Sequence, residues 1–156
     1  MEKPETYKKL ITLSLATVFG TGFIPIMPGT FGSLVAVGLF TAIRSNLTVL
    51  IVTAVSILTA FLVSGKAERI FKKNDPKQIV IDETAGQLTA YLFIPAQPIF
   101  IIMGFILFRM FDIFKIYPAN IAEKRKGSLG IVGDDLIAGI YANLCLHLII
   151  LIKRFL

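Results

Sequence analysis

The sequence predicts an all-α, polytopic membrane helix bundle of about four to six helices, some short or re-entrant, formed by residues 1–156 as a single domain. The first reason is composition: hydrophobic residues make up 55% of the chain and charged residues 17%, whereas about a quarter of a soluble domain is charged. The second is that several stretches of roughly membrane-spanning length carry no charge. The third is that the 16 basic residues outnumber the 10 acidic ones and cluster between apolar stretches, which suits membrane flanks better than nucleic acid.

The first uncharged stretch, residues 10–43, is interrupted by a segment rich in Pro and Gly from Phe23 to Thr30. A helix needs about 20 apolar residues to cross the hydrocarbon layer of a membrane. The arm before the interruption is too short to cross easily, and the arm after it, Phe31 to Ile43, is shorter still. We therefore expect the first arm to be re-entrant or to lie at the membrane surface.

Three later segments have simpler interpretations. Residues 45–65 and 136–154 have the length and apolarity of crossing helices, although the second pattern ends in Lys153 and Arg154. Residues 84–108 are also uncharged, but Pro95 and Pro98 interrupt them. Because proline breaks helices, this stretch predicts a helical hairpin. Its first arm starts at about Ile79, and its second arm ends at about Lys115.

Basic residues in short loops favour the cytoplasmic side of a membrane. Two basic clusters flank the predicted hairpin, so they lie on one side if both arms cross. That side is then the cytoplasmic one, and the uncharged loop at Ala96 is outside. The clusters comprise Lys66, Arg69, Lys72, Lys73 and Lys77, and then Lys115, Lys124, Arg125 and Lys126.

The acidic residues near apolar segments fall at the cytoplasmic ends of the expected helices: they are Asp82, Glu83, Asp112, Asp134 and Asp135. Carboxylates at a membrane boundary are costly unless they are paired, hydrated or coordinated. Hard divalent cations such as Mg²⁺ prefer oxygen ligands, so one interpretation is a shared metal site. The alternative is that each acid caps a helix or pairs with a surface cation. The group as a whole favours the metal site, and each single acid remains open.

Two further motifs suit a phosphate. Arg109, Asp112 and Lys115 are spaced three residues apart, so on a helix they share one side. They form either a phosphate clamp beside a metal ligand or a helix end whose cations reach headgroups. The segment containing Gly29, Thr30, Gly32 and Ser33 precedes an apolar run, so it is either a simple kink or a source of free N–H groups for an anion.

Histidine and cysteine chemistry is disfavoured, because the chain has one His and one Cys, both in the last apolar stretch. With His147 deep in that stretch, we expect neither a Cys or Ser nucleophile with a His base nor a histidine metal cluster. We expect His147 and Cys145 to be core residues.

Four ordered segments resemble the phosphatidylglycerophosphatase A family, and the likeness runs from about residue 10 to residue 145. The segments are residues 28–33 (PGTFGS), 79–86 (IVIDETAG), 108–115 (FRMFDIFK) and 130–139 (GIVGDDLIAG). The resemblance implies a Mg²⁺-dependent enzyme of the bacterial inner (cytoplasmic) membrane, which removes the terminal phosphate of phosphatidylglycerophosphate to give phosphatidylglycerol.

The expected mechanism uses these groups at the cytoplasmic end of the bundle. The five acids would hold one or two Mg²⁺ ions, which activate a water for attack on phosphorus. Arg109, Lys115 and the Gly29–Ser33 segment would bind the phosphate. Whether water or an aspartate attacks stays open, as does an alternative function as a small transporter or channel subunit whose acids carry a cation or proton.

Overall fold

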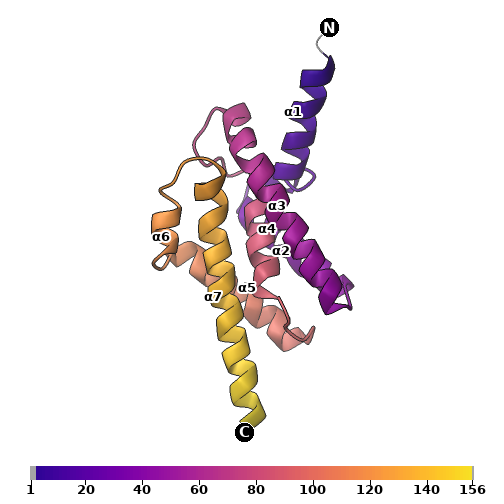
Figure 1. The fold of residues 1–156 in the computed structure, drawn as a ribbon, viewed down its shortest axis with the longest axis vertical. Helices are drawn as coiled ribbons and strands as arrows, with labels where there is room; N and C mark the ends of the chain where they lie inside the picture. The colour runs from indigo at the N-terminus through magenta and orange to yellow at the C-terminus, as the bar shows by residue number, and fades with distance from the viewer. Residues whose placement is uncertain (1–2, 156) are drawn as a thin grey trace.

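The computed structural model describes residues 3–155, and Met1, Glu2 and Leu156 of the predicted domain lie outside it. Within this range all regular structure is helical (Figure 1). The elements are α1 (Lys3–Ala16), the 3-10 helix η1 (Thr21–Phe23), α2 (Pro28–Ala42), α3 (Asn46–Phe71), α4 (Ile81–Ala90), α5 (Pro98–Phe114), α6 (Ala119–Ala122) and α7 (Ser128–Phe155). The all-α prediction is confirmed, with seven α-helices in the described residues instead of four to six.

Proline and left-handed residues set several helix boundaries. Pro28 and Pro98 stand at the first positions of α2 and α5, where a missing N–H costs nothing. Lys72 and Lys115 end α3 and α5 in the left-handed conformation, with φ of 53° and 44°. The predicted break near Pro95 is present, since α4 ends at Ala90 and α5 starts at Pro98.

Helix α4 lies at the centre of the molecule. It packs against α2, α3, α5 and α7, and all its residues except Glu83 are buried. Close approach to α7 depends on glycines, because a side chain at Gly139 would collide with the carbonyl oxygen of Gly86. At the far end of α4, the ring of Tyr91 stacks on Phe40 with centroids 4.4 Å apart. This packing fixes the start of α4 relative to α2, α5 and α7.

Among the described residues, two helices, α3 and α7, are long and apolar enough to cross a membrane, with mean hydropathies of 2.4 and 2.0 over their most apolar 18 residues. They match the predicted crossing segments, although α7 starts eight residues before the predicted Leu136. The ten residues of α4 span only about 15 Å, half the roughly 30 Å of a hydrocarbon layer. Helix α4 is thus shorter than the hairpin arm that the sequence predicts, and the crossing of that arm stays a prediction.

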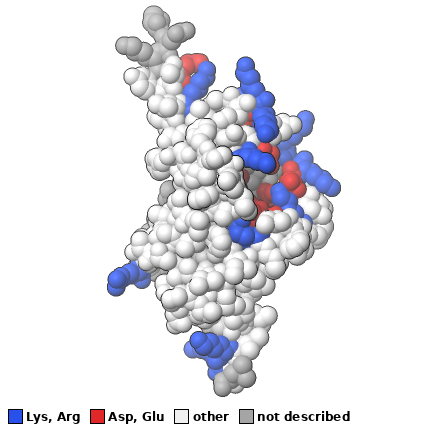
Figure 2. Space-filling view, turned by 180° about the vertical axis from the view of Figure 1, so that it is seen from behind, with Lys and Arg blue, Asp and Glu red and all other residues white. Residues whose placement is uncertain are grey.

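Charged side chains gather around a hollow on one face of the molecule (Figure 2). In a depression of this part of the molecule, Lys124, Arg125 and Lys126 of the second predicted basic cluster lie with Glu68 and Asp75, two acids from the segment that holds the first cluster. The expectation that His147 is a core residue is wrong, since its ring is exposed on α7, and Cys145 is only partly buried.

Candidate active site

The five predicted acids line one cavity of about 370 Å³. Three helices deliver them: Asp82 and Glu83 lie in the first turn of α4, Asp112 in the last turn of α5, and Asp134 and Asp135 in α7. These residues are separated by up to 53 positions in the sequence and meet because α5 and α7 both pack on α4.

Three of the acids form a tight group. Asp82, Glu83 and Asp135 each place a carboxylate oxygen within 4.8 Å of the others. Asp82 and Asp135 are only 5% and 4% exposed, and Asp82 Oδ1 and Glu83 Oε2 have no hydrogen-bond partner. Buried carboxylates this close repel one another unless a proton or cation lies between them. The donor set and its unpartnered oxygens therefore fit a hard divalent cation such as Mg²⁺.

The alternative, that each acid caps a helix or pairs with a cation, fits Asp112 and Asp134, which pair with Arg109 and Lys115 at 2.7 Å, but side-chain capping is not found at the start of α4. Val80 is the N-cap of α4, and no side chain makes a capping bond there. Asp134 and Asp135 were expected where a helix could begin, but α7 starts at Ser128, so they lie beyond its first turn. The reason is that residues 128–133 continue the helix despite two glycines. Gly130 is required there because a side chain would strike the carbonyl of Arg125.

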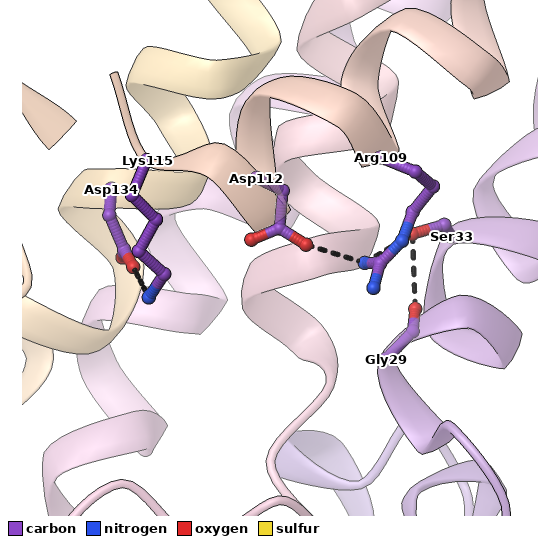
Figure 3. Close-up of polar contacts among 6 residues, drawn as sticks. All are labelled: Gly29, Ser33, Arg109, Asp112, Lys115 and Asp134. Carbon is purple, nitrogen blue, oxygen red and sulfur yellow. Dashed lines mark hydrogen bonds and ion pairs between the residues drawn. The ribbon is translucent and has the colours of Figure 1, made fainter. Parts of the chain in front are cut away.

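Arg109 reaches the cavity from α5 and is held on two sides (Figure 3). Its Nη1 lies 2.7 Å from Asp112 Oδ2 and 3.5 Å from Ser33 Oγ. Its Nε has no partner. Asp112 thus orients a guanidinium that retains donor capacity for a phosphate.

Lys115 does not join Asp112 as the sequence suggested. Its Nζ donates to Asp134 Oδ2 at 2.7 Å and lies 2.9 Å from Glu123 Oε1 (Figure 3 draws the first contact). Burial lowers the pKa of Lys115, but the hydrogen bonds to Asp134 and Glu123 outweigh this, so its pKa lies above the usual range. Lys115 is therefore a permanent cation that bridges α7 to the segment before it.

The segment from Gly29 to Ser33 is the start of α2, not a separate turn. Gly29 lines the cavity, and a side chain there would collide with Glu83 Oε1. Thr30, Gly32 and Ser33 do not line it: Thr30 N–H donates to Met27 O at 2.9 Å, and Ser33 Oγ donates to Gly29 O at 3.0 Å. Gly32 accepts a 2.9 Å hydrogen bond from Thr84 Oγ1. Gly32 thus joins α2 to α4 and Ser33 joins it to α5, whereas the Thr30 bond lies within the start of α2.

Sequence reasoning missed Asp75, Lys77 and Glu123. Asp75 and Lys77 lie in the loop before α4 and line the cavity. Asp75 is at its open edge, where partial desolvation raises the pKa and Lys115 opposes that rise. No spacing pattern marks these residues, because the loop reaches the cavity only through tertiary packing.

An all-helical chain with buried, clustered carboxylates and an oriented guanidinium in one cavity has the groups of an enzyme that acts on phosphate esters. The family model described as Phosphatidylglycerophosphatase A matches residues 14–150, so the chain belongs to this family and is a phosphatase.

Relatives agree with this assignment. Proteins named Phosphatidylglycerophosphatase A from Haemophilus influenzae and Escherichia coli are 38% and 31% identical to this chain. The first alignment covers 82% of each chain, and the second covers 86% of this chain and 81% of the relative. A Bacteroides thetaiotaomicron protein named "Putative phosphatidylinositol-3-phosphatase" is 34% identical over 91% of this chain and 92% of its own. No solved structure matches the chain.

Proposed function

We propose that this protein is a Mg²⁺-dependent phosphatase that hydrolyses phosphatidylglycerophosphate to phosphatidylglycerol and phosphate at the cytoplasmic face of the bacterial inner membrane. The observation that carries the proposal is the group of Asp82, Glu83 and Asp135 oxygens within 4.8 Å of one another, in a cavity that also holds Arg109. The substrate follows from the names of the Haemophilus influenzae and Escherichia coli relatives.

The chemistry divides between the metal and the chain. Bound Mg²⁺ supplies positive charge to the phosphate and lowers the pKa of a water molecule. Asp82, Glu83 and Asp135 hold the metal, with Asp134 beside them. Arg109, oriented by Asp112 at 2.7 Å, binds a phosphate oxygen and stabilises the charge that develops during transfer.

Membrane insertion is supported by α3 and α7. Their 26 and 28 residues span about 39 and 42 Å, more than the hydrocarbon layer requires. The cavity lies toward the C-terminal end of α3 and the N-terminal end of α7, near the basic clusters. The basic residues near that end support its assignment to the cytoplasmic side, because Lys and Arg in short loops favour that side.

Phosphate release from phosphatidylglycerophosphate by the purified protein tests the reaction. We expect release with Mg²⁺, a fall of at least about a hundredfold in excess EDTA, and recovery when Mg²⁺ is restored. Release that persists in EDTA would contradict the metal. No release under any of these conditions would contradict the reaction.

Orientation is tested with a membrane-impermeant thiol reagent in a Cys145→Ser background. Ala96→Cys should react from the periplasm in intact cells, and Lys73→Cys only after permeabilisation. The reverse pattern would place the cavity on the wrong side of the membrane.

A second substrate deserves the same assay because of the Bacteroides thetaiotaomicron relative, whose name refers to a phosphatidylinositol 3-phosphate. Its phosphate is also a monoester on a lipid headgroup. A larger kcat/KM for phosphatidylinositol 3-phosphate than for phosphatidylglycerophosphate would make the inositol lipid the preferred substrate. The transporter alternative loses its support because the chain belongs to a phosphatase family.

A further inference from the structure

The cavity has an apolar section of rim beside its charged walls. Among its lining residues, Met27 and Ile113 are large hydrophobic side chains that remain 59% and 62% exposed. Met27 is the N-cap of α2, and Ile113 lies in the last turn of α5. This section of the rim is therefore where α2 and α5 meet the cavity.

Exposed apolar side chains continue from the rim along both helices. On α5 they follow Ile113 at spacings of three or four residues, so they share one helix face. On α2 the exposed residues Phe31 and Leu34 follow Met27. The α5 residues are Met110, Ile106, Ile102 and Ile99. The charged cavity and the apolar surface that extends from it match the two parts of a phospholipid, a charged headgroup followed by apolar acyl chains.

The two helices leave a seam between them. Helix α2 packs mainly on α4, and α5 mainly on α7, so direct contacts between α2 and α5 are few. The contact that bridges them at the cavity is polar: Arg109 Nη1 lies 3.5 Å from Ser33 Oγ (Figure 3). A phosphate bound by Arg109 would thus sit at the inner end of this seam.

The lengths of α2 and α5 also favour lipid access on the side of the molecule where these two helices lie. The 15 residues of α2 and 17 of α5 span about 22 and 26 Å, less than a hydrocarbon layer of about 30 Å. Lipids thin or bend next to apolar surfaces that are too short. Headgroups beside α2 and α5 are therefore drawn toward the level of the cavity.

We infer that the seam between α2 and α5 is the lateral opening through which the phospholipid substrate reaches the cavity, with its acyl chains lying along the exposed faces that begin at Met27 and Ile113. This inference rests on the proposed lipid phosphatase function. The acyl chains are the chosen occupant because the apolar surface is continuous with the cavity that holds Arg109 and the acids.

A fluorescence experiment tests the seam without relying on turnover. The chain has no Trp, so Ile113→Trp introduces a single reporter, and Leu58→Trp is the matched control. Leu58 is 61% exposed on α3, which contributes no residue to the cavity lining. The vesicles are phosphatidylcholine with a small fraction of lipid brominated in its acyl chains, either phosphatidylcholine or a non-hydrolysable phosphonate analogue of phosphatidic acid, with Mg²⁺ present.

At position 113 the brominated phosphonate should quench at least about twofold more than brominated phosphatidylcholine, because a held ligand raises the local concentration of its chains. At position 58 the two lipids should quench equally. Equal quenching at position 113 would overturn the inference.

A kinetic experiment separates the seam from the reaction. The double variant Met27→Ser/Ile113→Ser is assayed on diacyl phosphatidylglycerophosphate in mixed micelles and on the deacylated, water-soluble compound. The ratio of kcat/KM for the lipid to that for the soluble compound should fall about fivefold or more, since apolar contact with the chains is lost. Leu58→Ser should leave the ratio unchanged.

The two failures are distinguishable. A ratio in the double variant equal to that in Leu58→Ser overturns the seam while the phosphatase function stands. No phosphate release by the wild-type protein from either compound overturns the proposed function, and the quenching result then still decides whether the seam holds a lipid phosphate analogue.

Discussion

Helices α3 and α7 are alike in length and apolarity, yet they contribute differently to the cavity. They contain 26 and 28 residues, and their most apolar 18 residues have mean hydropathies of 2.4 and 2.0. Helix α3 gives the cavity no lining residue, whereas α7 gives it Ile131, Asp134 and Asp135. Length and hydropathy thus identify two candidate spans without distinguishing scaffold from site. The two helices differ in the positions at which charged residues occur within their apolar sequences.

The interruption in α7 is tolerated because α4 covers it. Asp134 and Asp135 are 6% and 4% exposed, although they lie in a helix with many exposed apolar side chains farther along. The polar side chains that α3 buries, Thr53 and Ser64, are neutral: the Thr53 hydroxyl donates to Val49 O at 2.8 Å, and the Ser64 hydroxyl lacks a hydrogen-bond partner. Burying these charges in α7 is unfavourable unless each acid binds a cation or shares a proton with a neighbouring acid.

The largest expected effect separates the two helices at their buried polar residues. Asp135→Asn preserves size and removes a charge, so phosphate release should fall at least about a hundredfold while the protein still folds and inserts. Ser64→Ala in α3 should retain near-normal turnover. Phosphate release and thermal unfolding of both purified variants provide the measurement.

Asp134→Asn extends the same test. Near-normal turnover in both Asp134→Asn and Asp135→Asn would remove this pair from the metal site. Asp82, Glu83 and Asp112 would then be the remaining acids.

A second comparison uses a glycine from each helix. At Gly139 in α7 an added Cβ would strike the Gly86 carbonyl and lie 3.1 Å from Thr89 Cβ. At Gly65 in α3 it would lie 2.9 Å from the Ser128 hydroxyl, which can rotate, and 3.1 Å from the Ser128 nitrogen. Alanine gains about 1 kcal/mol of helix propensity at either position, and overpacking against backbone costs about 1–3 kcal/mol.

Gly139→Ala should therefore lower the thermal midpoint more than Gly65→Ala does. It should also reduce activity, because Asp135 lies one turn away and would shift from Asp82 and Glu83. Equal midpoints in the two variants would show that α4 and α7 do not depend on close backbone contact.

The smallest expected effect concerns the bridge from Lys115 to Asp134 of α7. Lys115→Met should reduce the free energy of unfolding by about 1 kcal/mol. Because the folded-state pKa of Lys115 is raised, the contribution is complete below the ordinary lysine pKa of about 10.4 and is lost as the pH rises through the folded-state pKa. The gap between the wild-type and variant midpoints should stay constant from about pH 7 to pH 9. A gap that closes within that range would contradict the bridge.

Features that depend on local composition could be predicted from the sequence, whereas contacts between distant residues could not. The apolar stretches locate α3 and most of α7, and Pro95 and Pro98 locate the break between α4 and α5. The start of α7 at Ser128 is missed because Gly130 and Gly133 resemble loop residues until their neighbours are known.

The candidate site likewise has residues that the local sequence identifies and contacts that depend on the fold. The sequence selects the five acids and Arg109 from their unusual positions beside apolar segments, and the structure places all six around one cavity. The partners of Lys115 could not be predicted, because Asp134 is 19 residues away and the bond depends on how α5 meets α7. Thr30, Gly32 and Ser33 resemble an anion loop only while α2 is viewed without α4.

The short central helix has a consequence for how the protein is made. Helix α4 carries Asp82 and Glu83, spans about 15 Å and buries Thr84, Gln87 and Thr89. A segment this short and polar gains too little from hydrocarbon to partition into a bilayer by itself. It therefore depends on packing against other helices of the protein, chiefly α2, α3 and α7. Since α7 follows α4 in the chain, the group of Asp82, Glu83 and Asp135 can form only after α7 has been synthesised, and a chain truncated before α7 lacks Asp135.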